Sequence, residues 1–177
     1  LAACYRAFDW LGWTELIYNH ITARVPGADR HYLINPYGLW YNEVTASNLV
    51  KVDLAGKAVD GSPHAVNVAG FVIHSAVHRA KHEIDCVIHT HTVAGMAVSA
   101  MKCGLLPLTQ NAMFFGQLGY HDYESVAIDL DEQQRLVRDL GGGAAMILRN
   151  HGLLTAGRTV CEAFVTMHWL EKACQAQ

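Results

Sequence analysis

The fold class is indicated first by residues 17–34, which read IYNHITARVPGADRHYLI. Residues 17–25 and 31–34 are rich in apolar and β-branched side chains, a composition typical of strands. The four residues between them, Pro26-Gly27-Ala28-Asp29, are a turn signal. Two strands joined by so short a turn run antiparallel, so the sheet is predicted to begin with a hairpin.

Helices are predicted on both sides of this hairpin. Helical spacing of apolar side chains recurs in five segments, residues 1–11, 68–80, 94–101, 131–140 and 160–174. Short apolar strands are predicted at 86–88 and 144–148. No linker or internal repeat divides the chain, so residues 1–177 are expected to form one domain. Hairpins with interspersed helices predict an α/β fold with a mainly antiparallel sheet and argue against a doubly wound parallel one.

The composition argues against nucleic acid and membranes as partners. The 177 residues are 51% hydrophobic and 16% charged, and their formal net charge is -3. No run of Lys or Arg supplies the positive surface that nucleic acid or an anionic bilayer attracts. So small a share of charge leaves apolar surface for subunit contacts, and we expect a homo-oligomer.

The cysteines and the hydropathy pattern predict a cytoplasmic protein. Five cysteines, an odd number without a CxxC pair, are typical of reduced core residues in the cytosol. No apolar stretch approaches the roughly 20 residues of a membrane helix, and no signal-peptide pattern is present. The helical pattern already begins at Leu1, a feature expected of a piece of a longer protein.

Three histidines have the spacing of a metal site. His89 and His91 are two residues apart where an apolar strand ends, so both side chains leave the same face of that strand. His151 follows another apolar strand, in the turn Asn150-His151-Gly152. Three imidazoles suit zinc, or another divalent ion, and leave a coordination position open for water or a substrate oxygen. Taken alone, an HxH pair fits two polar residues beside a loop equally well.

The other eight of the eleven histidines are weaker candidates. His74 and His78 are spaced i and i+4 on a predicted helix, but no carboxylate or third histidine lies at a telling distance, so we expect a structural role. The remaining six are isolated and are expected at the surface or in hydrogen bonds: His20, His31, His64, His82, His121 and His168.

Five motifs together resemble the class II aldolase/adducin family over nearly the whole chain. They are Tyr18-Asn19-His20-Ile21-Thr22-Ala23-Arg24, Asn35-Pro36-Tyr37-Gly38, Gly70-Phe71 with His74-Ser75-Ala76, Ile88-His89-Thr90-His91-Thr92, and Leu148-Arg149-Asn150-His151-Gly152-Leu153. The resemblance implies a three-layer α/β/α arrangement around the mainly antiparallel sheet. It also implies that His89, His91 and His151 bind zinc, and that four subunits form a ring with active sites at their boundaries.

Departures from the aldolase pattern concern the acid/base residue and the class of substrate. The Glu that serves those aldolases as acid/base is matched by Gly70, nineteen residues before His89, and glycine can neither accept a proton nor bind metal. Two serines that help to hold a substrate phosphate are matched by Val68 and Ala69, so phosphorylated sugars are disfavoured. Asn19, Tyr37 and Gly38 match substrate-binding positions of the family, although turn chemistry alone explains them equally well.

Two functions remain open from the sequence. One is a zinc-dependent aldolase or related lyase that acts through an enediolate on a small, unphosphorylated hydroxy- or keto-carbonyl compound, with its acid/base unidentified. The other is a non-catalytic oligomerisation module like the cytoskeletal adducin head, with a vestigial metal site, because residues 97–107 and Tyr120-His121-Asp122-Tyr123 are similar to that head. The histidine triad favours the enzyme, and Gly70 favours the module.

Overall fold

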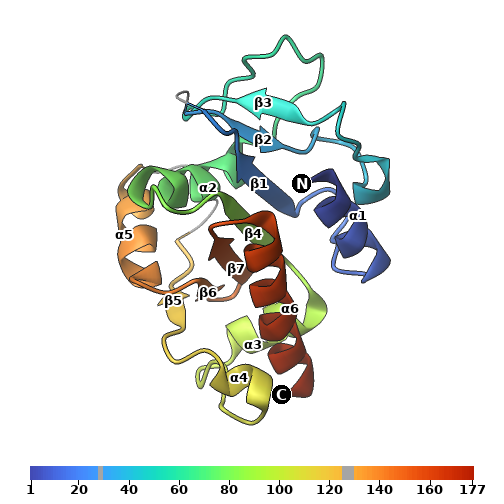
Figure 1. Ribbon diagram of the computed structural model, residues 1–177. Coiled ribbons are helices and arrows are strands. Elements are labelled where there is room, and N and C mark those ends of the chain that lie inside the picture. Colours follow the sequence, from blue (N-terminus) through green and yellow to red (C-terminus); the bar gives the residue numbers. More distant parts are fainter. Residues whose placement is uncertain (28–29, 125–129) are drawn as a thin grey trace.

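The computed structural model describes residues 1–27, 30–124 and 130–177. Within these residues seven strands form one sheet, in the order β3-β2-β1-β4-β7-β6-β5 (Figure 1). The strands are β1 (His20–Arg24), β2 (Tyr32–Ile34), β3 (Val50–Val52), β4 (Cys86–Thr90), β5 (Gly119–His121), β6 (Ala145–Leu148) and β7 (Gly152–Gly157). The helices are α1 (Ala2–Trp10), α2 (Val68–Ala80), α3 (Val93–Ala100), α4 (Gln110–Met113), α5 (Leu130–Leu140) and α6 (Val160–Ala176), with a short 3-10 helix η1 (Tyr41–Glu43).

The sheet is mainly antiparallel, as predicted. β1 and β2 form the expected antiparallel pair, with Ala23 opposite Leu33. The second half of the predicted turn between them, Ala28 and Asp29, lies outside the described residues. Among the described strands, β5 and β6 are the one parallel pair, because the chain passes through α5 between them and not through a tight turn. The sheet is therefore mixed.

β1 begins at His20, three residues later than the strand predicted at 17–25. Leu16 has a positive φ of 48°, and the Tyr18 N–H donates to the Glu15 carbonyl oxygen, so the chain turns just before the sheet. The Asn19 side chain then donates to the Trp13 carbonyl oxygen. This turn brings residues 13–19 beside the end of β4, where the candidate site lies.

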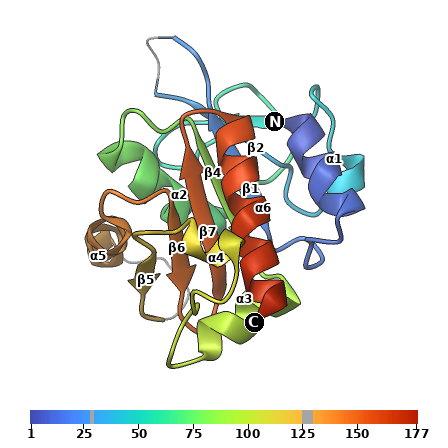
Figure 2. The ribbon, with the colours of Figure 1, turned by 60° about the horizontal axis from the view of Figure 1, so that its bottom comes forward.

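Alternate residues of the central strands face two layers of helices. Ile88 of β4 packs in a core with α1 and α6, whereas its neighbour Val87 packs in a core with α2 and α5. The same alternation in β6 separates Ile147 from Met146. Figure 2 shows α6 along one face of the sheet, with α2 and α5 on the other side. The expected three-layer α/β/α arrangement is confirmed.

Side-chain alternation also fixes where the predicted metal ligands point. His89 lies two residues beyond Val87, so its side chain leaves β4 on the α2 side of the sheet. The β1 residue opposite it is His20. None of the helices in the described part of the chain is long and apolar enough to cross a membrane.

Candidate metal centre

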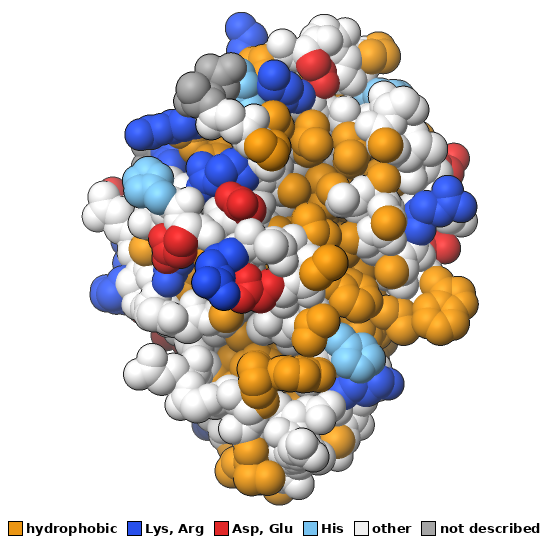
Figure 3. All heavy atoms as spheres, in the orientation of Figure 1, with side chains coloured by type: hydrophobic (Ala, Val, Ile, Leu, Met, Phe, Trp, Pro, Cys, Tyr) orange, Lys and Arg blue, Asp and Glu red, His pale blue; other side chains and the backbone are white. Residues whose placement is uncertain are grey.

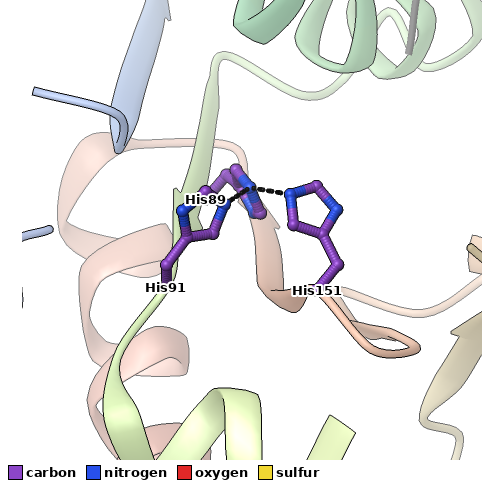
Figure 4. A group of neighbouring side chains, drawn as sticks. All are labelled: His89, His91 and His151. Atoms are coloured by element: carbon purple, nitrogen blue, oxygen red, sulfur yellow. Dashed lines mark hydrogen bonds between the residues drawn. The ribbon is translucent and has the colours of Figure 1, made fainter. Parts of the chain in front are cut away.

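The three histidines predicted to bind metal meet at one end of β4. His89 is on β4, His91 follows its last residue, and His151 lies in the turn that joins β6 to β7. Because β7 pairs with β4 and places Leu154 opposite His89, this turn lies beside the end of β4. Figure 4 shows the three rings converging from these two segments.

The turn that carries His151 depends on two neighbouring residues. Asn150 has a φ of 56°, in the left-handed region that asparagine tolerates better than most residues. Gly152 lies so close to β4 that a Cβ there would come within 3.0 Å of the Thr90 carbonyl oxygen. Asparagine and glycine at these positions therefore allow His151 to reach His89.

The ring nitrogens are close enough to share one ion. The Nε2 atom of His89 lies 2.7 Å from Nε2 of His91 and 3.2 Å from Nε2 of His151. In the part of the chain that the structure describes, this is the one group of three or more His, Cys, Asp or Glu residues whose ligating atoms all lie within 4.8 Å of one another.

The hydrogen bonds made by the Nδ1 atoms of His89 and His91 determine whether each Nε2 carries a proton or a lone pair. Nδ1 of His89 lies 2.9 Å from the Leu153 carbonyl oxygen, and Nδ1 of His91 lies 2.6 Å from a carboxylate oxygen of Glu15. Both oxygens are acceptors, so each Nδ1 carries the proton and each Nε2 presents a lone pair. Two lone pairs 2.7 Å apart repel each other unless a proton or cation lies between them. The donor set thus fits a divalent ion held by neutral imidazoles.

Burial keeps the imidazoles of His89 and His151 in the neutral form. Loss of solvation, together with the neighbouring histidines, holds the pKa of His89 well below its ordinary value. The same two causes lower the pKa of His151 to about 4. Neutral imidazole is the form that binds metal, so no deprotonation is needed at neutral pH.

Two residues from the turn before β1 hold His91. Glu15 accepts from Nδ1 of the ring, and Oδ1 of Asn19 accepts from the His91 backbone N–H at 3.0 Å. Asn19, which was predicted to contact substrate, is buried. Its side-chain amide accepts this hydrogen bond and donates another to the Trp13 carbonyl oxygen. Glu15 was not predicted: it lies 76 residues from His91 and belongs to no motif.

The three histidines border a pocket of about 570 Å³. Tyr37, predicted to bind substrate, lines it, whereas its neighbour Gly38 is exposed with a φ of 97° and is not part of the described lining. Tyr123 also lines the pocket, with its ring 6.1 Å from that of His151. Further lining residues are Glu15, Tyr18, His20, Asn67, Gly70, Ile73, Met96 and Asn150.

The rival pair His74 and His78 lies apart from this centre. Both are buried on α2, where they contact the Thr22 hydroxyl of β1. His20, expected at the surface or in a hydrogen bond, is buried, is hydrogen bonded to His74 and lines the pocket. His20 belongs to the motif of residues 18–24, but its place in the pocket does not follow from that motif, because the contact with His74 joins residues 54 positions apart.

The sequence profile of the Class II Aldolase and Adducin N-terminal domain matches residues 1–177. The chain therefore belongs to this family, as its motifs indicated. Alpha-adducin of Rattus norvegicus is 51% identical over 100% of this chain and 24% of its own length. A Pseudomonas aeruginosa protein, whose name places it provisionally among class 2 aldolases, is 52% identical over 100% of this chain and 68% of its own length.

Solved structures show the same fold. An aldolase II superfamily protein from Pseudomonas syringae matches with a TM-score of 0.97 and 54% identity, over 100% of this chain and 71% of that one. L-fuculose 1-phosphate aldolase from Glaciozyma antarctica PI12 matches with a TM-score of 0.90 and 35% identity, over 100% of this chain and 70% of that one. The first match covers the whole of this chain, so the fold predicted from the sequence is confirmed.

Proposed function

We propose that this chain binds one divalent ion, preferably zinc, on His89, His91 and His151, and acts as an aldolase-type lyase on a small, unphosphorylated hydroxy- or keto-carbonyl compound. The observation that carries this proposal is the opposed pair of Nε2 lone pairs on His89 and His91, which a cation would stabilise. Similarity to an L-fuculose 1-phosphate aldolase supports the reaction type.

A bound divalent ion would supply an electrophile that polarises a substrate carbonyl. The chain contributes the geometry. Three imidazoles converge from two sides, and Glu15 and the Leu153 carbonyl group fix the orientation of two of them. The hydroxyl-bearing rings of Tyr37 and Tyr123 line the same pocket as the histidines, where they can donate hydrogen bonds to a substrate oxygen.

The pocket favours a substrate without a phosphate group. Its described lining contains no Lys or Arg side chain. A phosphate group taken from water into this pocket would lack the cationic partner that normally compensates its charge. Hydroxyl, amide and imidazole groups instead suit a compound that carries hydroxyl and carbonyl oxygens. The fuculose-phosphate aldolase relative therefore supports the type of chemistry more than the identity of the substrate.

A second candidate is a non-catalytic oligomerisation module, favoured by the 51% identity to alpha-adducin. Figure 3 shows hydrophobic side chains gathered in a broad band over the face where α1 and α6 lie. Trp10 of α1 and Val165 of α6 are among the exposed large hydrophobic side chains. Such a surface suits self-association. For either function, we therefore propose that the protein is cytoplasmic and that four copies of the chain form a tetramer. Each chain contributes a single domain.

Metal analysis of protein purified without chelators separates the two candidates. The enzyme should carry one zinc ion per chain and cleave small hydroxy-carbonyl compounds, and both properties should be lost on chelation and restored by zinc. A protein that stays empty when zinc is supplied would contradict the enzyme. A protein that binds zinc but is inactive in screens for aldol cleavage, epimerisation and decarboxylation would favour the module.

A further inference from the structure

A row of buried side chains runs from the pocket into the space between β1 and α2. Nδ1 of His20 lies 2.8 Å from Nε2 of His74. The hydroxyl oxygen of Thr22 lies 2.7 Å from Nδ1 of His74 and 2.8 Å from Nε2 of His78. The row ends where Nδ1 of His78 lies 3.4 Å from the Ile84 carbonyl oxygen. All four side chains are almost completely buried.

The carbonyl end of the row fixes the direction of each hydrogen bond. The Ile84 oxygen is an acceptor, so Nδ1 of His78 carries a proton and its Nε2 accepts from the Thr22 hydroxyl. That hydroxyl has one proton to donate, so its oxygen accepts from Nδ1 of His74. Nε2 of His74 then accepts from Nδ1 of His20. A neutral His20 is left with an unprotonated Nε2.

Burial favours the neutral state along the whole row. Loss of solvation is the main cause that holds the pKa of His74 well below the ordinary value, and the His20 ring is buried beside it. Loss of solvation and the charge of Arg24 lower the pKa of His78 to about 3. The directions of the hydrogen bonds therefore apply at neutral pH.

Gly70 leaves Nε2 of His20 open to the pocket. Both residues line it. A Cβ at residue 70 would come within 3.0 Å of Nε2 and Cδ2 of His20, so any side chain there would cover the nitrogen or displace the ring. Gly70 lies in the first turn of α2 without a positive φ, where backbone preference alone favours alanine. The space beside His20 is the structural reason for glycine.

We infer that His20 is a substrate-binding residue, and that its unprotonated Nε2 accepts a hydrogen bond from a hydroxyl group of the bound hydroxy-carbonyl compound. His74, Thr22 and His78 are positioning residues that hold His20 in the acceptor tautomer. The ring centroid of His20 lies 5.1 Å from that of His89, so the acceptor is adjacent to the candidate metal centre. The substrate role rests on the proposed function, whereas the tautomer does not.

Nitrogen-15 NMR of histidine-labelled protein tests the tautomer without metal or ligand. We expect His20, His74 and His78 in the Nδ1-protonated form at neutral pH, and the exposed His82 with the averaged signals of a ring in water. Thr22→Val removes the hydroxyl with little change of shape and should release His20 from this form. A wild-type spectrum in which Nε2 of His20 is protonated would overturn the inference.

Two hydroxamates test the acceptor role in zinc-loaded protein. Acetohydroxamate and glycolohydroxamate chelate zinc through the same two oxygens and differ by one hydroxyl group. By titration calorimetry, that hydroxyl should improve affinity roughly five- to tenfold for the wild-type protein. This gain in affinity should disappear in His20→Phe, and in Gly70→Ala, which keeps every histidine but covers Nε2 of His20 or displaces its ring. It should persist in Gly116→Ala, because a Cβ there meets nothing within 4 Å.

The possible outcomes separate this inference from the proposed function. If both hydroxamates bind equally to the wild-type protein, or if the gain survives in His20→Phe and Gly70→Ala, the acceptor role is wrong and the metal site stands. If neither binds, the open coordination position required by the proposed function is wrong and so is the substrate role of His20, and the NMR spectrum still decides its tautomer.

Discussion

Single residues of the histidine triad should be indispensable for tight metal binding. Replacing His89, His91 or His151 with alanine leaves two imidazoles, which hold zinc far less well than three. We expect each variant to lose tight binding, measured by competition with a chromophoric chelator. His82→Ala, at an exposed position, should keep the wild-type affinity, and so should His78→Gln. Unchanged affinity in the three triad variants would place the ion elsewhere.

Glu15 should tune the affinity of the site from outside the triad. Its carboxylate accepts from Nδ1 of His91, which fixes the tautomer and raises the basicity of Nε2. We expect Glu15→Gln to weaken zinc binding by about 10- to 100-fold, as the loss of such partners does elsewhere. Glu83→Gln, at an exposed position, is the matched control. Equal affinities in the two variants would show that the contact has no role in binding.

The buried histidines should make the folded protein sensitive to acid. The pKa of His78 is lowered from 6.5 to about 3 by burial and by Arg24. Between these values the unfolded chain binds a proton that the folded chain does not, so stability is complete above about pH 6.5 and falls as the pH drops toward 3. The fall amounts to at most about 1.4 kcal/mol per pH unit for one histidine.

Urea unfolding at several pH values checks this expectation. His78→Gln removes one of the groups responsible, so its stability should fall less steeply between pH 6.5 and 3 than that of the wild-type protein. Because His20 and His74 are also held neutral by burial, part of the slope should remain. Parallel curves for variant and wild type would mean that His78 is not a source of the pH dependence.

At the level of elements, the distance between β4 and β7 should depend on Gly152. A Cβ there would come within 3.0 Å of the Thr90 carbonyl oxygen, which is backbone and cannot rotate away. We expect Gly152→Ala to cost about 1–3 kcal/mol in the free energy of unfolding, and to weaken zinc binding by moving His151 from His89. Gly142→Ala, where a Cβ meets nothing within 4 Å, should change neither quantity.

The sequence predicted those helices and strands whose buried side chains recur at the spacing of a helix or a strand. The hairpin in residues 17–34 and the helices α2 and α6 follow from turn residues and spacing, and the alternation of Val87 and Ile88 between two cores completes the layers. β7 was not predicted, because it begins at a glycine and is defined by its two neighbours in the sheet. Parallel pairing of β5 with β6 likewise depends on α5, not on local sequence.

The site was predictable as far as its motifs extend. The HxH pair and the turn at His151 led directly to three rings that the structure brings together. Glu15 lies in no motif, and His20 lies in the motif of residues 18–24 without a role in the pocket being evident from it. Their partners are 76 and 54 residues away, so both contacts depend on how β1 meets β4 and α2. Asn19 belongs to a motif, but only its contacts show that the amide holds the backbone of His91.

At the level of the whole molecule, the exposed aromatic and aliphatic side chains should be covered by other copies of the chain. Trp10 is 85% exposed and Val93 is 82% exposed, which is unusual for such large apolar groups. Light scattering should give a mass about four times the 19.5 kDa of one chain. Trp10→Glu and Val93→Glu should each reduce it, since a carboxylate buried in an interface lacks a partner. A wild-type mass near that of one chain would exclude the tetramer.

The close approach of Gly70 to His20 also restricts how this sequence can diverge. An imidazole at residue 20 and a side chain at residue 70 compete for one space, so the two positions should covary among relatives. The order of change matters as well. A lineage that acquires a carboxylate at residue 70 must first give up the imidazole, so Gly70→Glu should be tolerated in a His20→Ala background and destabilising in the wild-type one. Ancestors with small residues at both positions would therefore be the branch point between pockets with an imidazole at residue 20 and pockets with a carboxylate at residue 70.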